Sequence, residues 1–211
     1  MKLYGYWRSS AAYRIRIALN LKGAACELVA VNLLGEEDKA RYAAKNPTAL
    51  VPTLELDDGA CIRQSLAIVD YLERAYPSPK LIPEHPARRA EALAFACDIG
   101  MEIHPLNNLR VLRRLKQQHG FSEAGAVEWM HHWMHASFIH LEKLVDAAGP
   151  FCFGDAPCIA DVFLIPQLYN AARWGLELSA YPNLIRVNNA ALMQPAFSDA
   201  HPDKQSDASV D

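Results

Sequence analysis

Long apolar runs are missing from this sequence of 211 residues. Every hydrophobic stretch is short and interrupted by charges, so we expect no membrane-spanning segment. The first residues, Met1 to Tyr4, enter strand-like sequence at once and lack the apolar core of a signal peptide. The five cysteines contain no CxxC pair and are odd in number. Together with the missing signal, this predicts reduced thiols in a cytoplasmic protein.

The sequence also has no excess of positively charged residues. The formal net charge is −3 at pH 7, which gives no electrostatic footprint for nucleic acid. Any bound anion must therefore be held by a local arrangement of arginines. His131 and His135, in "WMHHWMHASFIH", have the i, i+4 spacing of metal ligands, but no HExxH pattern and no suitably placed Cys or Asp accompanies them. We predict no metal site and interpret these histidines as part of a helix face.

Residues 1–80 have the pattern of a small α/β domain. The expected order is strand, helix, strand, helix, hairpin and helix, over residues 2–7, 11–22, 27–33, 36–45, 51–63 and 65–75. Within the hairpin, the Asp58-Gly59 pair supplies the positive φ angles that a tight turn needs.

The rest of the chain has helical periodicity and contains no internal repeat. Pro77, Pro79, Pro83 and Pro86 mark a linker, because proline cannot continue a helix. We expect an all-helical domain over residues 87–198, with helices at 87–115, 123–147, 159–174 and 183–193. The polar residues 199–211 are predicted to form a mobile tail without a function.

Two pairs of residues at expected helix starts have two interpretations each. Ser9 and Ser10 are typical N-cap residues, but a helix N-terminus with a hydroxyl group can also hold an anionic ligand. Gln64 and Ser65, at the next helix start, are either a second cap or a carboxylate site.

Val51-Pro52 opens a predicted strand, where proline belongs at an edge or a turn. If this peptide is cis, Val51 can present its backbone groups to an extended peptide ligand; an ordinary trans proline is the alternative. The junction between an α/β and a helical domain is a favourable place for such a cleft.

Five segments then carry a family resemblance. They are "RSSAAYRIRIALNLKG", "NPTALVPTLELDDG", "IRQSLAIVDYLE", "IHPLNNLRVL" and "ADVFLIPQLYNAARW". From Met1 to about Pro195 the chain closely resembles the zeta-class glutathione transferases, with the motifs in the same order and spacing. The resemblance implies a thioredoxin-like N-terminal domain followed by an all-α domain, which is the glutathione transferase fold.

The same resemblance implies a glutathione cofactor. Val51 would pair with its cysteinyl backbone beside a cis-Pro52, Gln64 and Ser65 would hold its γ-glutamyl carboxylate, and the Ser9 hydroxyl would face its sulfur. Ser9 and Ser10 are the implied catalytic residues. The implied cofactor-binding set is Ser9, Ser10, Ala11, Val51, Gln64, Ser65, His104, Asn108, Leu109 and Arg110.

Arginines at three positions match substrate-binding residues of the family. Arg8, Arg110 and Arg173 would bind a small dicarboxylate, since guanidinium groups grip carboxylates in two-pronged fashion. For each arginine taken alone the alternative is a solvated surface residue, and it is the three together, from separate family motifs, that favour a joint site. For His104 and Asn108 the alternative is a helix kink ahead of Pro105 with a capping amide.

Two positions depart from the family pattern. Ala11 stands where these isomerases usually have cysteine, and we expect activity to survive because the reacting thiol belongs to glutathione. Cys158 stands where transferases place Ser or Thr to cap a core helix. Asp161 keeps the other half of that capping box, so this change bears on stability.

The implied function is cis–trans isomerisation of maleylacetoacetate or maleylpyruvate in aromatic compound degradation, by addition of the thiolate, rotation and elimination. A general transferase acting on α-haloacids or peroxides is the alternative, and a glutathione-binding protein without chemistry is a second one that Ser9 argues against. The family also implies a homodimer.

Overall fold

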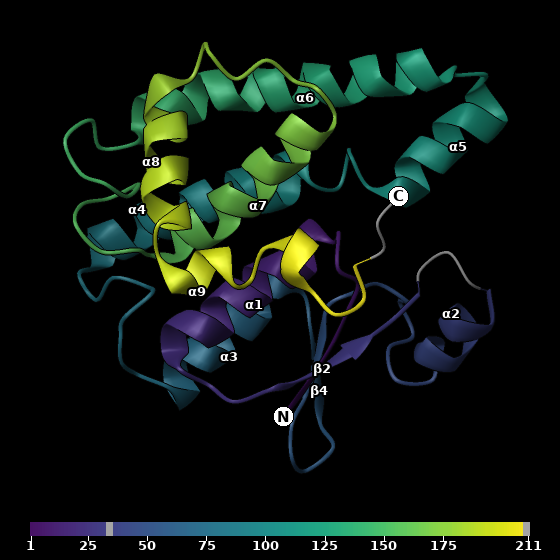
Figure 1. Cartoon of the computed structure of the whole chain (residues 1–211), viewed down its shortest axis with the longest axis horizontal. Helices are drawn as coiled ribbons and strands as arrows, with labels where there is room; N and C mark the ends of the chain where they lie inside the picture. The colour runs from purple at the N-terminus through teal and green to yellow at the C-terminus, as the bar shows by residue number, and fades with distance from the viewer. Residues whose placement is uncertain (33–35, 209–211) are drawn as a thin grey trace. The chain divides into compact units, whose positions relative to one another are not determined.

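A computed structural model describes residues 1–32 and 36–208 of the chain (Figure 1). The described residues divide into two units, each treated by itself below. The first unit contains residues 1–81 together with residues 192–208, and the second contains residues 82–191.

The first unit is built on a four-stranded mixed sheet in the order β2-β1-β3-β4. Its strands are β1 (Lys2–Gly5), β2 (Glu27–Ala30), β3 (Thr53–Glu55) and β4 (Cys61–Arg63). β1 pairs with β2 in parallel and with β3 antiparallel, and β3 and β4 form the predicted hairpin. The second strand ends at Ala30, earlier than expected, and Leu33 lies outside the described residues.

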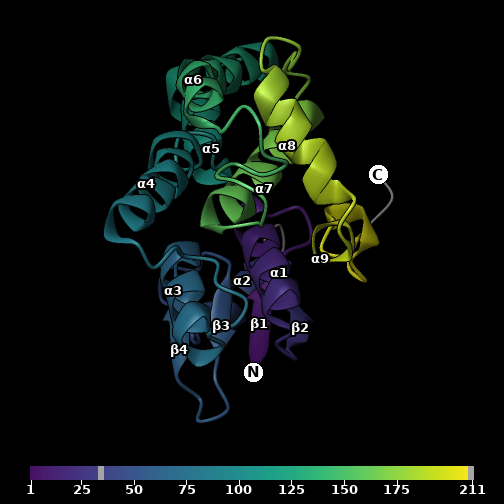
Figure 2. The same cartoon turned by 90° about the vertical axis from the view of Figure 1, so that its left-hand side faces the viewer.

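Two helices, α1 (Ser10–Lys22) and α3 (Ser65–Ala75), lie side by side along one face of the sheet (Figure 2). Side chains alternate along a strand, so Leu3 and its partner Leu54 share one face, and both are buried. Lys22 joins the two helices through a buried ion pair with Glu73, with 2.6 Å between Nζ and Oε2. The helix α2 (Glu36–Ala43) completes the predicted βαβαββα order.

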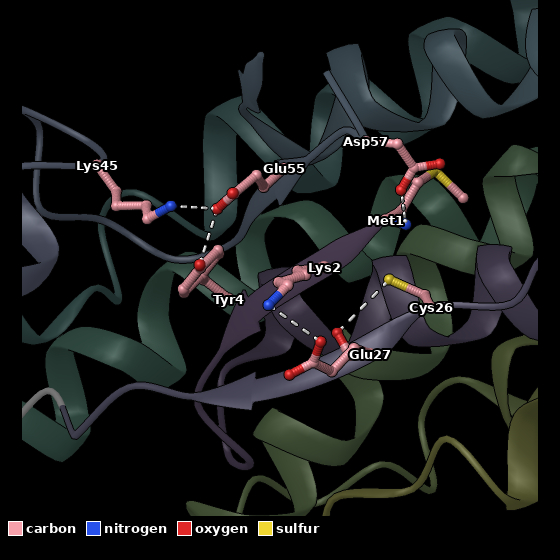
Figure 3. Close-up of polar contacts among 8 residues, drawn as sticks. All are labelled: Met1, Lys2, Tyr4, Cys26, Glu27, Lys45, Glu55 and Asp57. Atoms are coloured by element: carbon pink, nitrogen blue, oxygen red, sulfur yellow. Dashed lines mark hydrogen bonds and ion pairs between the residues drawn. The ribbon is translucent and has the colours of Figure 1, made fainter. Parts of the chain in front are cut away.

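The alternate residues of β1 carry polar contacts (Figure 3). The Tyr4 hydroxyl donates to Glu55 Oε2 at 2.8 Å, and Lys45 Nζ reaches the same oxygen at 2.5 Å. Lys2 Nζ lies 3.2 Å from Glu27 Oε2 on the neighbouring strand. Surface pairs of this kind contribute little to stability. Buried apolar side chains such as Leu3 and Leu54 therefore contribute more to the stability of the sheet than these polar pairs do.

The second unit is helical. Its elements are α4 (Pro86–Cys97), the π-helix η1 (Asp98–Ile103), α5 (Leu109–His119), α6 (Glu123–Leu144), α7 (Ile159–Arg173) and α8 (Pro182–Leu192, whose last residue falls in the first unit). α7 is buried continuously from Ile159 to Leu168, so it forms the centre of this unit. Asp161, which is fully buried, accepts from the Cys158 and Cys152 N–H groups, both at 2.8 Å.

The predicted single helix over residues 87–115 is wrong. The chain passes from α4 into η1 and is non-helical around Pro105 before α5 begins. Proline lacks the N–H that a continuing helix needs, and π-helical turns of this kind often occur at functional sites.

The C-terminal segment, residues 192–208, contains two short helices, of which only the second falls within the expected tail of residues 199–211. α9 (Pro195–Ser198) and the 3-10 helix η2 (Pro202–Lys204) fold against the first unit, where α9 packs beside α1. Tyr13 and Asn20 of α1 donate to the carbonyls of Phe197 and Ala196, at 3.4 and 3.0 Å. These contacts join distant parts of the sequence, so composition alone could not reveal them. Residues 209–211 lie outside the described residues.

Candidate functional site

Three segments of the first unit leave the same end of the sheet. In the β-ladder, Tyr4 lies opposite Thr53, and Thr53 lies opposite Arg63. The residues that follow β1, precede β3 and follow β4 therefore emerge together. These are the segments with the predicted ligand residues Arg8 to Ala11, Val51-Pro52 and Gln64-Ser65.

Ser9 is the N-cap of α1. Its Oγ accepts from the Ala12 N–H at 3.2 Å, and its backbone is extended, with φ −66° and ψ 116°. Capping uses a lone pair of the hydroxyl oxygen and leaves the O–H proton able to donate to another acceptor. The capping interpretation is thus confirmed, and it is compatible with a ligand role. Ser10 and Ala11 are more buried, at 5% and 7% exposure, whereas Ser9 is half-buried.

Gln64 has an unusual backbone at the start of α3, with φ 69° and ψ 122°. A non-glycine residue in this region carries strain of about 1–3 kcal/mol, and such strain clusters at ligand-binding sites. The Gln64 side chain makes no capping hydrogen bond and is exposed. The first N–H groups of α3 and this exposed amide together form a fitting place for a carboxylate.

Arg14 is a further candidate site residue, which the sequence interpretation did not include. Its side chain is 1% exposed, and Nη1 donates to Ser65 Oγ at 3.2 Å. Burial lowers the pKa of the Arg14 guanidinium to about 9, so it still carries its charge at pH 7. This charge favours an anion at the start of α3. The residue lies within the helical run of α1, where local pattern gives no sign of a buried cation.

A buried polar network fixes the loop before Val51. The Tyr42 hydroxyl contacts Thr53 Oγ1 at 2.6 Å and donates to the Leu50 carbonyl at 2.9 Å. Asn46 Nδ2 donates to Thr53 Oγ1 and to the Leu50 carbonyl, at 3.1 and 2.7 Å. The Val51-Pro52 peptide that follows is cis, as the ligand interpretation required.

The remaining cofactor-binding candidates belong to the second unit and follow one another closely. His104 succeeds the π-helix, and its N–H donates to the Ile99 carbonyl at 3.0 Å. Asn108 is the N-cap of α5, with Oδ1 accepting from the Arg110 N–H at 3.1 Å. The expected capping amide is therefore present. Leu109 is 42% exposed, and the Arg110 side chain is exposed too.

Two of the three arginines predicted to bind substrate lie over aromatic rings. The Arg8 Cζ atom is 4.7 Å from the Trp7 ring centroid, and its Nη2 donates to the Tyr6 hydroxyl at 3.1 Å. Arg173, the last residue of α7, has its Cζ 4.7 Å from the Trp174 ring centroid. Aromatic contact of this kind holds a guanidinium in place. Arg8 belongs to the first unit, and Arg110 and Arg173 belong to the second.

The histidines of α6 have protein partners. His131 Nε2 lies 2.8 Å from the Trp174 carbonyl oxygen, and His135 Nδ1 bonds to the Tyr181 hydroxyl. Within residues 1–32 and 36–208, no group of three or more His, Cys, Asp or Glu residues could hold a metal ion. Over the same ranges, no helix is long and apolar enough to cross a membrane.

Comparison with known families now gives the class. Residues 3–80 match the family model of the glutathione S-transferase N-terminal domain. This match covers the sheet, its helices and the segments at the end of the ladder. The fold is that of a glutathione transferase, with a thioredoxin-like first unit and a helical second one.

Relatives that match the chain over nearly its full length identify the family within this class. A probable maleylacetoacetate isomerase from Vibrio cholerae serotype O1 is 46% identical over 210 residues, which covers 98% of this chain and 97% of the relative. The holo structure of a maleyl pyruvate isomerase, a bacterial zeta-class glutathione S-transferase, has a TM-score of 0.95 and 39% identity, covering 99% of this chain and 100% of the other. The maleylacetoacetate isomerase of Methylobacterium extorquens AM1, solved with bound malonate and glutathione, has a TM-score of 0.94 and 38% identity and covers 100% of both chains. The chain belongs to this zeta-class family of maleylacetoacetate and maleylpyruvate isomerases.

Proposed function

We propose that this protein is a glutathione-dependent cis–trans isomerase of maleylacetoacetate or maleylpyruvate. The observation that carries the proposal is the half-buried Ser9 hydroxyl at the N-terminus of α1, at the same end of the sheet as Val51 and Gln64. It occurs in a chain that resembles isomerases of this family over nearly its whole length.

The residues present suit glutathione, a short extended peptide with a carboxylate at each end. Its γ-glutamyl carboxylate would meet the α3 N-terminus at Gln64 and Ser65, with the Arg14 charge beneath. Its cysteinyl backbone would pair with Val51, whose position depends on the Tyr42 and Asn46 hydrogen bonds. The relative from Methylobacterium extorquens binds both glutathione and malonate, which supports a cofactor and a dicarboxylate in one protein.

When bound, glutathione supplies a thiolate that adds to the activated double bond, allows rotation about it and leaves again. A hydrogen bond from the Ser9 hydroxyl, together with the helix N-terminus, can supply the free energy needed to keep the bound thiol ionised. A thiol of pKa about 8.5 must fall by about 2 pKa units, or about 2.7 kcal/mol, to be mostly ionised at neutral pH. A hydrogen bond to a charged group contributes about 1.5–3 kcal/mol, and a helix N-terminus adds about 0.3–1 kcal/mol. Ser10 and Ala11 would complete the same turn.

The second unit would contribute to both ligands. His104, Asn108, Leu109 and Arg110 would lie by glutathione, as the family resemblance implies. Arg8, Arg110 and Arg173 would bind the two carboxylates of the substrate and stabilise the negative charge that develops on its ketone oxygen.

The proposal extends to assembly and location. A homodimer is expected from the family, and light scattering at micromolar concentration tests it; a monomeric mass would contradict it. The five cysteines are all unbonded thiols, which supports the reducing cytoplasm as the location.

Steady-state isomerisation tests the activity. Purified protein is given maleylacetoacetate and maleylpyruvate, each with and without glutathione, and product formation is followed by absorbance. We expect turnover of at least one substrate that depends on glutathione. If the protein turns over α-haloacids or peroxides and shows no isomerisation, the proposal is wrong and the protein is a general glutathione transferase.

A further inference from the structure

The backbone N–H and carbonyl of Trp7 both bond to charged side chains. The N–H donates to Asp207 Oδ2 at 3.1 Å, and the carbonyl accepts from Arg16 Nη2 at 3.0 Å. Hydrogen bonds with one ionised partner are stronger than neutral ones. Trp7 lies two residues before Ser9, in the short connection between β1 and α1. The conformation of this connection sets where the Ser9 hydroxyl lies.

Arg16 also holds the C-terminal segment. Its Nε donates to the Ala200 carbonyl at 2.9 Å, so one guanidinium joins Trp7 to residues near the end of the chain. The arginine is 6% exposed, and its Cζ lies 5.3 Å from the Tyr13 ring centroid. Because the fork is buried and planar, it fixes the two carbonyls relative to each other.

The segment that carries Asp207 is itself folded. Gln205 Nε2 donates to the carbonyls of Asp199 and His201, at 3.1 and 2.9 Å. Lys204 Nζ pairs with the Asp199 carboxylate at 3.0 Å. These bonds close residues 199–205 into a turn, which limits where Asp207 can lie. Gln205 and Asp207 then line a small cavity together with Trp7.

We propose that residues 199–208 form a clamp that positions the Ser9 hydroxyl for the thiolate of glutathione. Asp207 and Arg16 are its positioning residues, and both act through the backbone of Trp7. The inference rests on the proposed glutathione-dependent function. It gives a role to a segment whose polar composition suggested none, because the contacts of that segment end at the connection that carries the predicted catalytic serine.

The test compares three variants with the wild-type protein. Asp207→Ala removes the acceptor of the Trp7 N–H, whereas Asp207→Asn keeps a carbonyl oxygen there and loses only the charge. Asp58→Ala is the matched control, since Asp58 Oδ1 accepts the Ala60 N–H at 2.9 Å in the β3–β4 turn. The measurements are the pKa of the bound glutathione thiol, from thiolate absorbance against pH, and steady-state isomerisation, with thermal melts to verify folding.

We expect Asp207→Ala to raise the thiol pKa by about one unit and to lower kcat/KM roughly tenfold, since a displaced hydroxyl stabilises the thiolate less well. Asp207→Asn should restore most of both values, and Asp58→Ala should match the wild type. A purely electrostatic effect has the opposite sign, because removing a nearby carboxylate lowers a thiol pKa.

Three results would overturn the clamp: an unchanged thiol pKa in Asp207→Ala, a lowered one, or the same shift in Asp58→Ala. A wild-type protein that forms no thiolate with glutathione would instead refute the proposed function, and the clamp with it.

Discussion

Replacing Ser9 by glycine separates the two roles of its hydroxyl group. In the structure Ser9 Oγ caps α1 by accepting the Ala12 N–H at 3.2 Å, and the proposed function requires the same group to donate to a thiolate. Alanine would remove both roles. Glycine is tolerated at an N-cap with a loss of only a few tenths of a kcal/mol, so Ser9→Gly removes mainly the donor.

The expected magnitude follows from that hydrogen bond. Losing about 1.5–3 kcal/mol of thiolate stabilisation corresponds to a rise of about 1–2 units in the pKa of the bound thiol. At neutral pH this lowers kcat/KM by roughly ten- to hundredfold. The melting temperature should stay close to that of the wild type.

A second cap in the chain provides the control. Ser122 Oγ caps α6 by accepting the Gly125 N–H at 3.0 Å, and it has no place in the proposed site. Ser122→Ala should cost about 1 kcal/mol of unfolding free energy and leave turnover unchanged. Thiolate absorbance against pH, steady-state rates and thermal melts are measured for both variants. A Ser9→Gly protein with the wild-type thiol pKa and turnover would show that Ser9 is only a cap.

Three further predictions concern stability. Cys158→Ser should raise the unfolding free energy by about 1 kcal/mol in thermal melts, because a hydroxyl caps α7 beside Asp161 better than a thiol; a lower melting temperature would contradict this. Burial lowers the pKa of His201 and outweighs the nearby Asp203 carboxylate, which raises it. Just below pH 6.5, the ordinary pKa of histidine, the folded state therefore binds fewer protons than the unfolded state. Stability should therefore fall as pH decreases through 6.5, and denaturant melts should show a shallower fall in His201→Asn. Lys22→Met leaves Glu73 buried without its cation and should cost about 3–5 kcal/mol by denaturant melts, with a smaller loss when Glu73→Leu is added.

The local sequence pattern correctly predicted the helix ends and turns that depend on neighbouring residues. The helix beginning after Ser9 and ending at Gly23, which has φ 59°, follows from a capping hydroxyl and a residue that tolerates the left-handed region. The Asp58-Gly59 turn follows in the same way. In the second unit, proline chemistry at Pro105 indicated a kink, but the π-helix before it depends on packing that sequence spacing does not encode.

Contacts between segments that lie far apart in the sequence could not be predicted from local sequence pattern. Arg14 looks like one of several charged residues on a helix, and only its burial against Ser65 reveals its place in the site. The residues from Asp199 onward looked like a polar tail because Arg16, which donates to the Ala200 carbonyl, lies at the other end of the sequence. Family resemblance indicated which residues are expected to contact ligands, but it gave no information about the residues that support them.

The return of the C-terminal segment to the first unit has a consequence for synthesis. A ribosome releases residues 1–81 early, yet Phe197 and Ala200, which are buried in the same unit, emerge only after the whole second unit. Until then, the side of α1 that carries Tyr13 and Arg16 lacks its cover, although domains generally fold in the order in which they appear. The second unit can form its core before the first unit is complete, because residues 192–208 of the first unit have not yet been synthesised. A fragment that stops at the linker would accordingly lack part of the core on which its own first helix depends.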